Sequence, residues 1–274
     1  MKNRRLFVAS ACLSVSIFAI TSANAGSFTV DDSTAGATSY WGGNVLYDGN
    51  QLPSWSDIHG PASYGVDSLT ISVTASNLTA IVTGPFISFA NSTQNNYGIR
   101  PGDLFFSNTG WNPHKNDLTD NNYVNDNAAN GEQWDYVISM TNNTGFSGAI
   151  NLYTVDTLGD IVFPEEVLTS LLTAEYRTGQ EYRYNTAPGQ TSLGIGTWSI
   201  SGDILTYVLD LSTVSGTTIA DLFKNNGVIG VHWGMTCGND VIEGVGSPVP
   251  EPATMILFGT GLMGLAGMSR RKKK

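Results

Sequence analysis

The residues in this chain that could support nucleophilic chemistry are His232 and Cys237, with Asp240 close behind them. An imidazole within hydrogen-bond reach of a thiol activates it as a nucleophile, and histidine, cysteine and aspartate also bind metals. Positions five residues apart on one strand point to opposite faces, so these two side chains would not converge there. We therefore predict that His232 hydrogen-bonds at a strand edge and that Cys237 packs in the core.

A loop dense in oxygen ligands is the best candidate for a metal site. Asp117, Asp120 and Asp126, followed by Glu132, stand among several asparagines, and calcium binds six to eight oxygen ligands. The order of residues in an EF-hand is absent, and a solvated turn rich in Asn and Asp explains the same composition. Calcium binding and a plain turn are the two alternatives for this loop, and no other cofactor is predicted.

Pairs of acids raise the question of glycoside hydrolysis. Asp31–Asp32 and Glu165–Glu166 are adjacent acids, but this reaction needs two carboxylates that face each other across a cleft. Neighbours on a strand point to opposite faces, and acids at the start of a helix are explained by the helix dipole. We therefore predict no catalytic residue.

The tryptophans divide into two groups by their surroundings. Trp41, Trp55 and Trp111 lie among Gly, Pro and Asn, where exposed rings could stack on sugars. Core packing is the alternative, and it suits the tryptophans inside strand patterns, which are Trp134, Trp198 and Trp233. The first three are therefore our candidates for carbohydrate binding.

The elements that must position these residues are mostly strands. Apolar and polar residues alternate over 69–74 and 205–211, as in strands with one buried face, and turn signals such as Ser201–Gly202 separate them. Helical patterns are limited to 165–172 and 218–224. The chain is predicted to be all-β: an antiparallel β-sandwich, jelly-roll-like, with one or two short helices. A β-barrel is the alternative.

Charge separates the middle of the chain from its ends. Eight of the 13 basic residues lie at the two ends, which leaves five basic residues against 22 acidic ones in the middle, a net charge near −17. A surface this negative repels phosphate backbones, so nucleic-acid binding is not predicted. Solubility outside the cell, or capture of divalent cations, fits this charge better.

The N-terminus has the three parts of a secretory signal. Basic residues precede an apolar stretch over 6–20, and Ala23 and Ala25 form a small-x-small cleavage site. We predict that residues 1–25 are a signal peptide removed by signal peptidase. The mature chain then begins at Gly26, with 26–247 as one exported acidic domain.

The C-terminus reads as a hydrophobic segment between a proline-rich start and a basic end. Residues 253–268 are apolar or small, and 270–274 are all basic. As a helix the apolar stretch spans roughly 24 Å, slightly less than a hydrocarbon core of about 30 Å. The cations would stay in the cytoplasm. This pattern predicts a transmembrane helix that holds the domain outside the inner membrane, and a simple anchor is one interpretation of it.

The order Val-Pro-Glu-Pro, short Gly-rich hydrophobic segment, basic end resembles the PEP-CTERM sorting signal of Gram-negative surface proteins. The resemblance covers 248–274 and implies that exosortase recognises Pro250, Glu251 and Pro252 and removes the tail during export. Segments such as 102–106 and 232–240 also resemble parts of other exosortase-processed proteins.

These features together predict an exported protein of the cell surface or extracellular matrix. We expect a non-enzymatic structural or carbohydrate-binding component associated with exopolysaccharide and biofilm. An extracellular hydrolase or lyase that acts on polysaccharide is the alternative. The membrane would be a partner only through the C-terminal helix, before processing.

Overall fold

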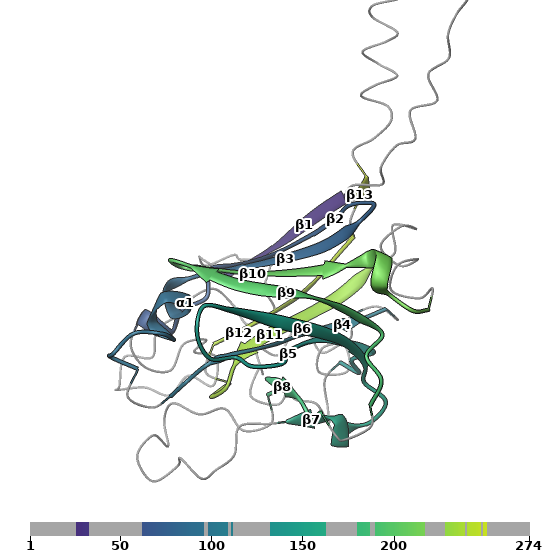
Figure 1. The fold of residues 1–274 in the computed structure, drawn as a ribbon. Helices are drawn as coiled ribbons and strands as arrows, with labels where there is room; N and C mark the ends of the chain where they lie inside the picture. Colours follow the sequence, from purple (N-terminus) through teal and green to yellow (C-terminus); the bar gives the residue numbers. More distant parts are fainter. Residues whose placement is uncertain are drawn as a thin grey trace, which may run out of the picture.

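The computed structural model describes residues 26–32, 62–95, 98–108, 111, 132–162, 180–186, 190–216, 228–238, 240–247 and 249–250. Eleven strands form one antiparallel sheet, and two form a second, small one (Figure 1). The strands of the large sheet are β1 (Gly26–Asp31), β2 (Ser68–Val73), β3 (Asn77–Thr83), β4 (Pro101–Ser107), β5 (Tyr136–Met140), β6 (Ser147–Thr154), β9 (Gly194–Ser201), β10 (Ile204–Asp210), β11 (Ile229–Met235), β12 (Val241–Gly246) and β13 (Val249–Pro250). The small sheet pairs β7 (Ile161–Val162) with β8 (Arg183–Tyr184).

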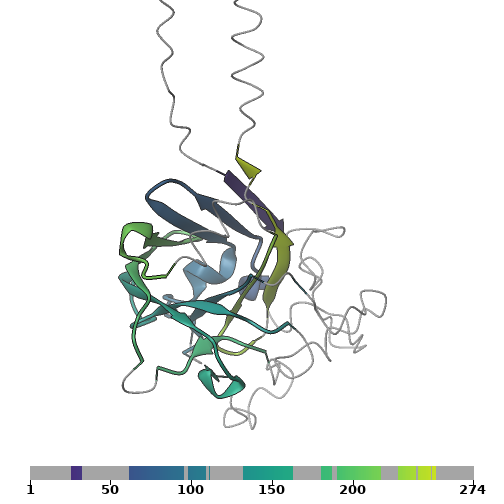
Figure 2. The same cartoon turned by 90° about the vertical axis from the view of Figure 1, so that its right-hand side faces the viewer.

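The large sheet curls until its two edges meet. Its order is β12-β11-β4-β5-β6-β9-β10-β3-β2-β1-β13, so its two outermost strands, β12 and β13, are consecutive in the chain. Figure 2 shows β12 beside β1. Gly246 of β12 approaches the ring of Phe28 in β1 so closely that an added Cβ would lie 2.0 Å from it. Only glycine fits at this contact.

The all-β, antiparallel class predicted from the sequence is therefore confirmed, whereas a sandwich or jelly roll is not. One continuous, nearly barrel-shaped sheet replaces two separate sheets. Alternation of apolar and polar residues does not distinguish these architectures, because a strand in either has one face in the core. The closure of the sheet depends on contacts between β1 and β12, which are far apart in sequence.

Local sequence explains several strands directly. β2 and β3 alternate buried and half-buried residues along their whole length, as their pattern predicts. The turn at Ser201–Gly202 is confirmed: β9 and β10 pair from Ser201 opposite Ile204, and Gly202 has a φ of 59°. Glycine adopts this left-handed conformation at no steric cost.

The core fills the inside of the curled sheet. Trp198, Trp233 and Tyr207 are among its largest fully buried side chains, and the Trp233 indole N–H donates to the Tyr207 hydroxyl at 2.9 Å. The prediction that Trp134, Trp198 and Trp233 are buried is confirmed. Cys237 is also buried in this core, as predicted.

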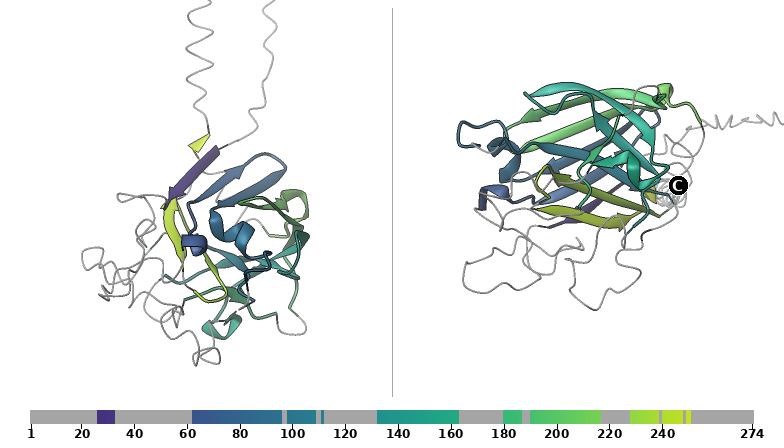
Figure 3. Two further views of the ribbon diagram at one scale, coloured as in Figure 1. Left: turned by 90° about the vertical axis from the view of Figure 1, so that its left-hand side faces the viewer. Right: turned by 90° about the horizontal axis from the view of Figure 1, so that it is seen from below.

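Helices are few among the described residues. A short α-helix, α1 (Pro85–Phe89), lies across the opening at one end of the curled sheet (Figure 3, left) and was not predicted. Three 3-10 turns are η1 (Ala62–Tyr64), η4 (Leu158–Asp160) and η6 (Leu211–Thr213). The predicted helices at 165–172 and 218–224 lie outside the described residues.

The predicted targeting segments also lie largely outside the described residues. This applies to the signal peptide, 1–25, and to the apolar segment 253–268. Within the described part of the chain, no helix has the length and apolar character needed to cross a membrane.

Candidate functional site

A buried polar cluster lies on the outer face of the large sheet, where β4, β11 and β12 meet. Every residue of β4 and β11 is buried, so both faces of these strands are covered. The inner face packs into the main core, and the outer face lies under a second apolar group that includes Phe105, Trp134 and Tyr184. The small sheet, β7–β8, belongs to this outer layer.

Asp103, on β4, links the large sheet to the outer layer by hydrogen bonds. Its carboxylate accepts hydrogen bonds from the backbone N–H groups of Met140 and Tyr184, both at 2.8 Å. The Asp103 N–H donates in turn to the carbonyl of Tyr182 at 2.7 Å. Burial raises the pKa of Asp103 to about 6, and the hydrogen bonds from Tyr184 and Met140 oppose this rise.

His232 is the centre of the polar cluster and is fully buried. Its Nε2 lies 2.8 Å from the backbone carbonyl oxygen of Glu181, and its Nδ1 lies 2.8 Å from Oε2 of Glu243. A carbonyl oxygen only accepts, so Nε2 must carry a proton. In the neutral imidazole, Nδ1 is then an acceptor, which requires the carboxyl of Glu243 to donate.

The protonation of Glu243 agrees with this arrangement. Burial raises its pKa to about 8; the hydrogen bond from Trp111 lowers the pKa, and the nearby charge of Glu132 raises it. Glu243 is therefore mostly protonated at neutral pH. Its O–H can donate to Nδ1 of His232, so this hydrogen bond requires no buried charge on Glu243.

Two tryptophans complete what we call the His–Glu cluster, formed by His232, Glu243, Glu181, Trp111 and Trp134. The indole N–H of Trp111 donates to Oε1 of Glu243 at 2.8 Å, and that of Trp134 donates to Oε1 of Glu181 at 3.3 Å. The rings of Trp134 and His232 lie 5.4 Å apart between centroids. Each of the two carboxyl groups thus accepts a hydrogen bond from an indole.

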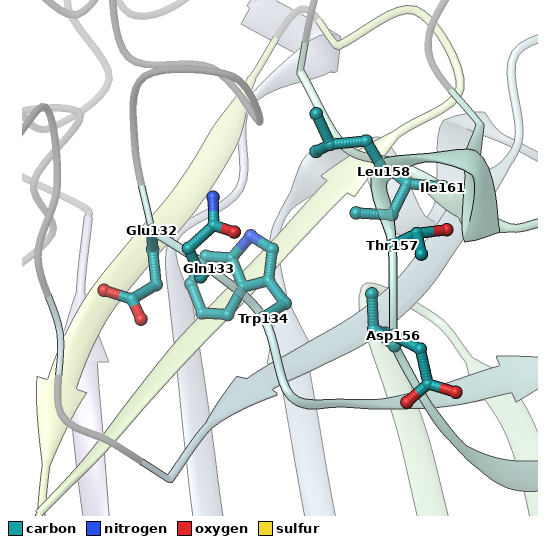
Figure 4. A pocket seen from close by; sticks show the side chains of 8 residues that line it. Glu132, Gln133, Trp134, Asp156, Thr157, Leu158 and Ile161 are labelled. Atoms are coloured by element: carbon teal, nitrogen blue, oxygen red, sulfur yellow. The ribbon is translucent and has the colours of Figure 1, made fainter.

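A small pocket opens beside the His–Glu cluster. Figure 4 shows Glu132, Gln133 and Trp134 on one side of it and Asp156, Thr157 and Leu158 on the other. Glu132 is buried, and its negative charge raises the pKa of Glu243 in the neighbouring His–Glu cluster. The pocket therefore presents an aromatic edge with an acid on each side.

His232 and Cys237 do not converge, as the sequence predicted. His232 projects from the outer face of β11, whereas Cys237 belongs to the inner core, so they form no nucleophile–base pair. Asp240 is buried and accepts the backbone N–H of Val66. His232 does hydrogen-bond as predicted, but the expectation of a strand edge is wrong, because β11 pairs with β4 on one side and β12 on the other.

The structure describes two of the predicted carbohydrate and calcium residues, Trp111 and Glu132. Trp111 is half-buried and hydrogen-bonded to Glu243, and Glu132 lines the pocket. Trp41 and Trp55 lie outside the described residues, as do the remaining calcium candidates, Asp117, Asp120 and Asp126. No group of three or more potential metal ligands occurs within the residues that the structure describes.

Sequence reasoning missed the roles of Glu181, Glu243 and Asp103. A signal was present for two of them: Asp103 and Glu243 interrupt otherwise apolar strand sequences, Gly-Asp-Leu-Phe-Phe and Val-Ile-Glu-Gly-Val. An acid inside such a run indicates either an exposed face or a buried, hydrogen-bonded carboxyl.

A second surface of interest is the outward face of β2, β3, β10 and β9. Cross-strand rows place uncharged side chains, six of the eight with a hydroxyl, side by side: one row is Ser72, Thr79, Val208 and Thr197, and the next is Thr70, Ile81, Thr206 and Ser199. Asp210 is the single charged residue on these four strands. We call these two rows the hydroxyl face.

The two ends of the described chain meet at the edge of the large sheet. β13 pairs with β1 antiparallel, with Gly26 opposite Pro250 and Ser27 opposite Val249. Pro250 is the one predicted exosortase recognition residue that the structure describes; Glu251 and Pro252 lie outside it, as do Ala23 and Ala25 at the signal cleavage site.

Comparison with known families identifies the motif at the C-terminus of the chain. Residues 248–272 match the model of the PEP-CTERM protein-sorting motif. The chain carries a PEP-CTERM sorting motif. This confirms the predicted resemblance and supports export, surface sorting and processing by exosortase. No curated protein and no solved structure matches the chain.

Proposed function

We propose that the mature domain is a non-enzymatic component of the cell surface or extracellular matrix that binds the carbohydrate of exopolysaccharide, as in a biofilm. The observation that carries this proposal is the hydroxyl face, an uncharged surface on a domain with a net charge near −17. The PEP-CTERM motif supports delivery to the compartment where such a polymer is found.

The chemistry of the hydroxyl face suits a neutral polymer. Threonine and serine hydroxyls donate and accept hydrogen bonds, and the methyl groups of threonine add apolar contact. Thr197 and Ser199 are exposed, and their row neighbours are half-buried. An anionic polymer would be repelled by the acidic remainder of the domain, unless calcium bridged the two.

A glycan array probed with the mature protein, with and without calcium, tests the proposal. Retention of neutral glycans in both conditions supports binding at the hydroxyl face, and retention of acidic glycans only with calcium would instead favour the loop at 117–132. If no glycan is retained under either condition, carbohydrate binding is wrong and a purely structural role remains.

A hydrolase or lyase is the second candidate, and one observation favours it. Glu243 has a pKa of about 8 and lies near Glu132, and glycosidases pair a protonated carboxyl with an ionised one. Against it, Glu243 and His232 are only 3% and 0% exposed. Release of reducing ends or unsaturated products from polysaccharide, abolished by Glu243→Gln, would establish this activity.

A further inference from the structure

The edge strand β13 leads into the sorting motif. Two residues separate the end of β12 from the start of β13, yet β13 pairs with β1 at the opposite edge of the sheet. In the described part of the chain, this two-residue ladder is the hydrogen-bonded connection between the first and last strands. The residues that precede the tail therefore take part in the fold.

The same ladder brings the two processing sites together. Gly26 is the first residue after the predicted signal cleavage, and it lies opposite Pro250, the first residue of the Pro-Glu-Pro sequence. Figure 1 shows the start of β1 and β13 side by side at one end of the sheet. Both cuts thus fall at one end of the folded domain.

A turn without charged residues lies beside the two processing sites, with Asp210, opposite Asn77, at its margin. Val73 pairs with Gly26, so the turn between β2 and β3 lies at the same end, and its residues Thr74, Ala75 and Ser76 are exposed and uncharged. We call Gly26–Ser27, Val249–Pro250 and residues 74–76 the processing pole. The predicted signal peptide and the apolar tail segment both continue the chain from this pole, so both membrane-directed segments leave the domain at one end.

We propose that the processing pole is the surface that the folded domain presents to the membrane, and that exosortase cleaves the tail while β13 is paired with β1. The pairing extends to Pro250, so the cleaved bond lies C-terminal to this residue. The proposal rests on the sorting motif and the strand register, and it is independent of carbohydrate binding.

Engineered disulfides in the full chain test this proposal. Ser27→Cys combined with Val249→Cys places thiols on opposed residues, whose Cα atoms are about 4.5–5.5 Å apart in an antiparallel pair, within the range of a disulfide. Thr29→Cys with Val249→Cys is the matched control, because it is two residues out of register, at a diagonal distance of about 7–8 Å. Both variants also carry Cys237→Ala, so that no native thiol remains after signal cleavage.

The variants are exported in a host that contains exosortase, and both cross-linking and tail removal are measured by mass. We expect the opposed pair to cross-link and the control not to, and we expect the cross-linked chain to lose its tail to the same extent as the unmodified protein. Equal cross-linking in the two variants would contradict the strand register. Accumulation of a cross-linked chain with its tail intact would show that exosortase needs β13 released, which overturns the proposal.

Discussion

The sheet has two sectors that bury their residues in different ways. In β2, β3 and β10, buried residues alternate with half-buried or exposed ones, so one face packs in the core and the other faces outward. In β4 and β11 every residue is buried. Asp103 and Glu243 of this second sector are buried, because the outer layer excludes water from them.

The difference shows what covering a sheet does to its polar groups. Asp210, half-buried at the end of the first sector, has its pKa lowered by its hydrogen bonds with Ser212. Glu243, covered in the second sector, has its pKa raised to about 8 by burial. The same type of group is thus a surface charge in one sector and a hydrogen-bonded neutral acid in the other.

The largest expected effect is on stability, from Glu243→Ala. This change leaves His232 Nδ1 and the indole N–H of Trp111 without their partner and opens a cavity, so the free energy of unfolding should fall by about 3 kcal/mol. Thr79→Ala on the hydroxyl face is the matched substitution and should cost about 0.5 kcal/mol or less. Urea denaturation of both variants measures the contrast, and equal losses would mean that the two sectors do not differ as described.

The second expectation concerns pH. The pKa of Glu243 is higher in the folded state, about 8, than its ordinary value of 4.5, so the folded protein holds the proton more tightly. Its contribution to stability is complete below pH 4.5 and is lost progressively as pH rises towards 8. Asp103, with a pKa raised to about 6, acts in the same direction at lower pH.

Glu243→Gln isolates this contribution. The amide can still donate to His232 and accept from Trp111, but it does not titrate. Denaturation midpoints measured from pH 5 to pH 9 should therefore decline less steeply in this variant than in the unmodified protein. An unchanged pH dependence would contradict the protonated state of Glu243.

The hydroxyl face gives the third prediction. Thr79→Asp combined with Thr197→Asp places two carboxylates in one row, and we expect retention on a neutral polysaccharide to fall by about tenfold, about 1.4 kcal/mol. Stability should change little, because both positions face outward. The control is Thr144→Asp, in the exposed turn between β5 and β6. A similar loss of retention in the control would place binding elsewhere.

The smallest expected effect comes from Trp111→Phe. This change removes the N–H that donates to Glu243 but keeps an aromatic ring, and it should lower the free energy of unfolding by about 1 kcal/mol. Because that hydrogen bond lowers the pKa of Glu243, the pKa should also rise further. The pH dependence of denaturation reports both effects, and a downward shift would contradict the assigned bond.

The two sectors also differ in how well sequence alone predicts them. Alternation over 69–74 and 205–211 indicated strands correctly, because each has one face in water. The second sector has no such periodicity, since both of its faces are buried. Its key contacts join residues far apart in the chain, such as Trp111 with Glu243 and His232 with Glu181. Local sequence patterns do not indicate which residues remote in the chain come into contact, so the His–Glu cluster was not predicted.

The sorting motif was predictable for the opposite reason. It is a linear signal read by a processing enzyme, so residue order alone identifies it. The pairing of Pro250 with Gly26 was not predictable, because it depends on how the whole sheet closes.

An intact mass of the protein recovered from outside the cell tests export and processing most directly. The mass should correspond to a chain that begins at Gly26 and ends just after Pro250, with both cut ends at the processing pole. Recovery of a chain that still extends to Lys274 would contradict cleavage by exosortase and, with it, the assignment of this protein to the cell surface.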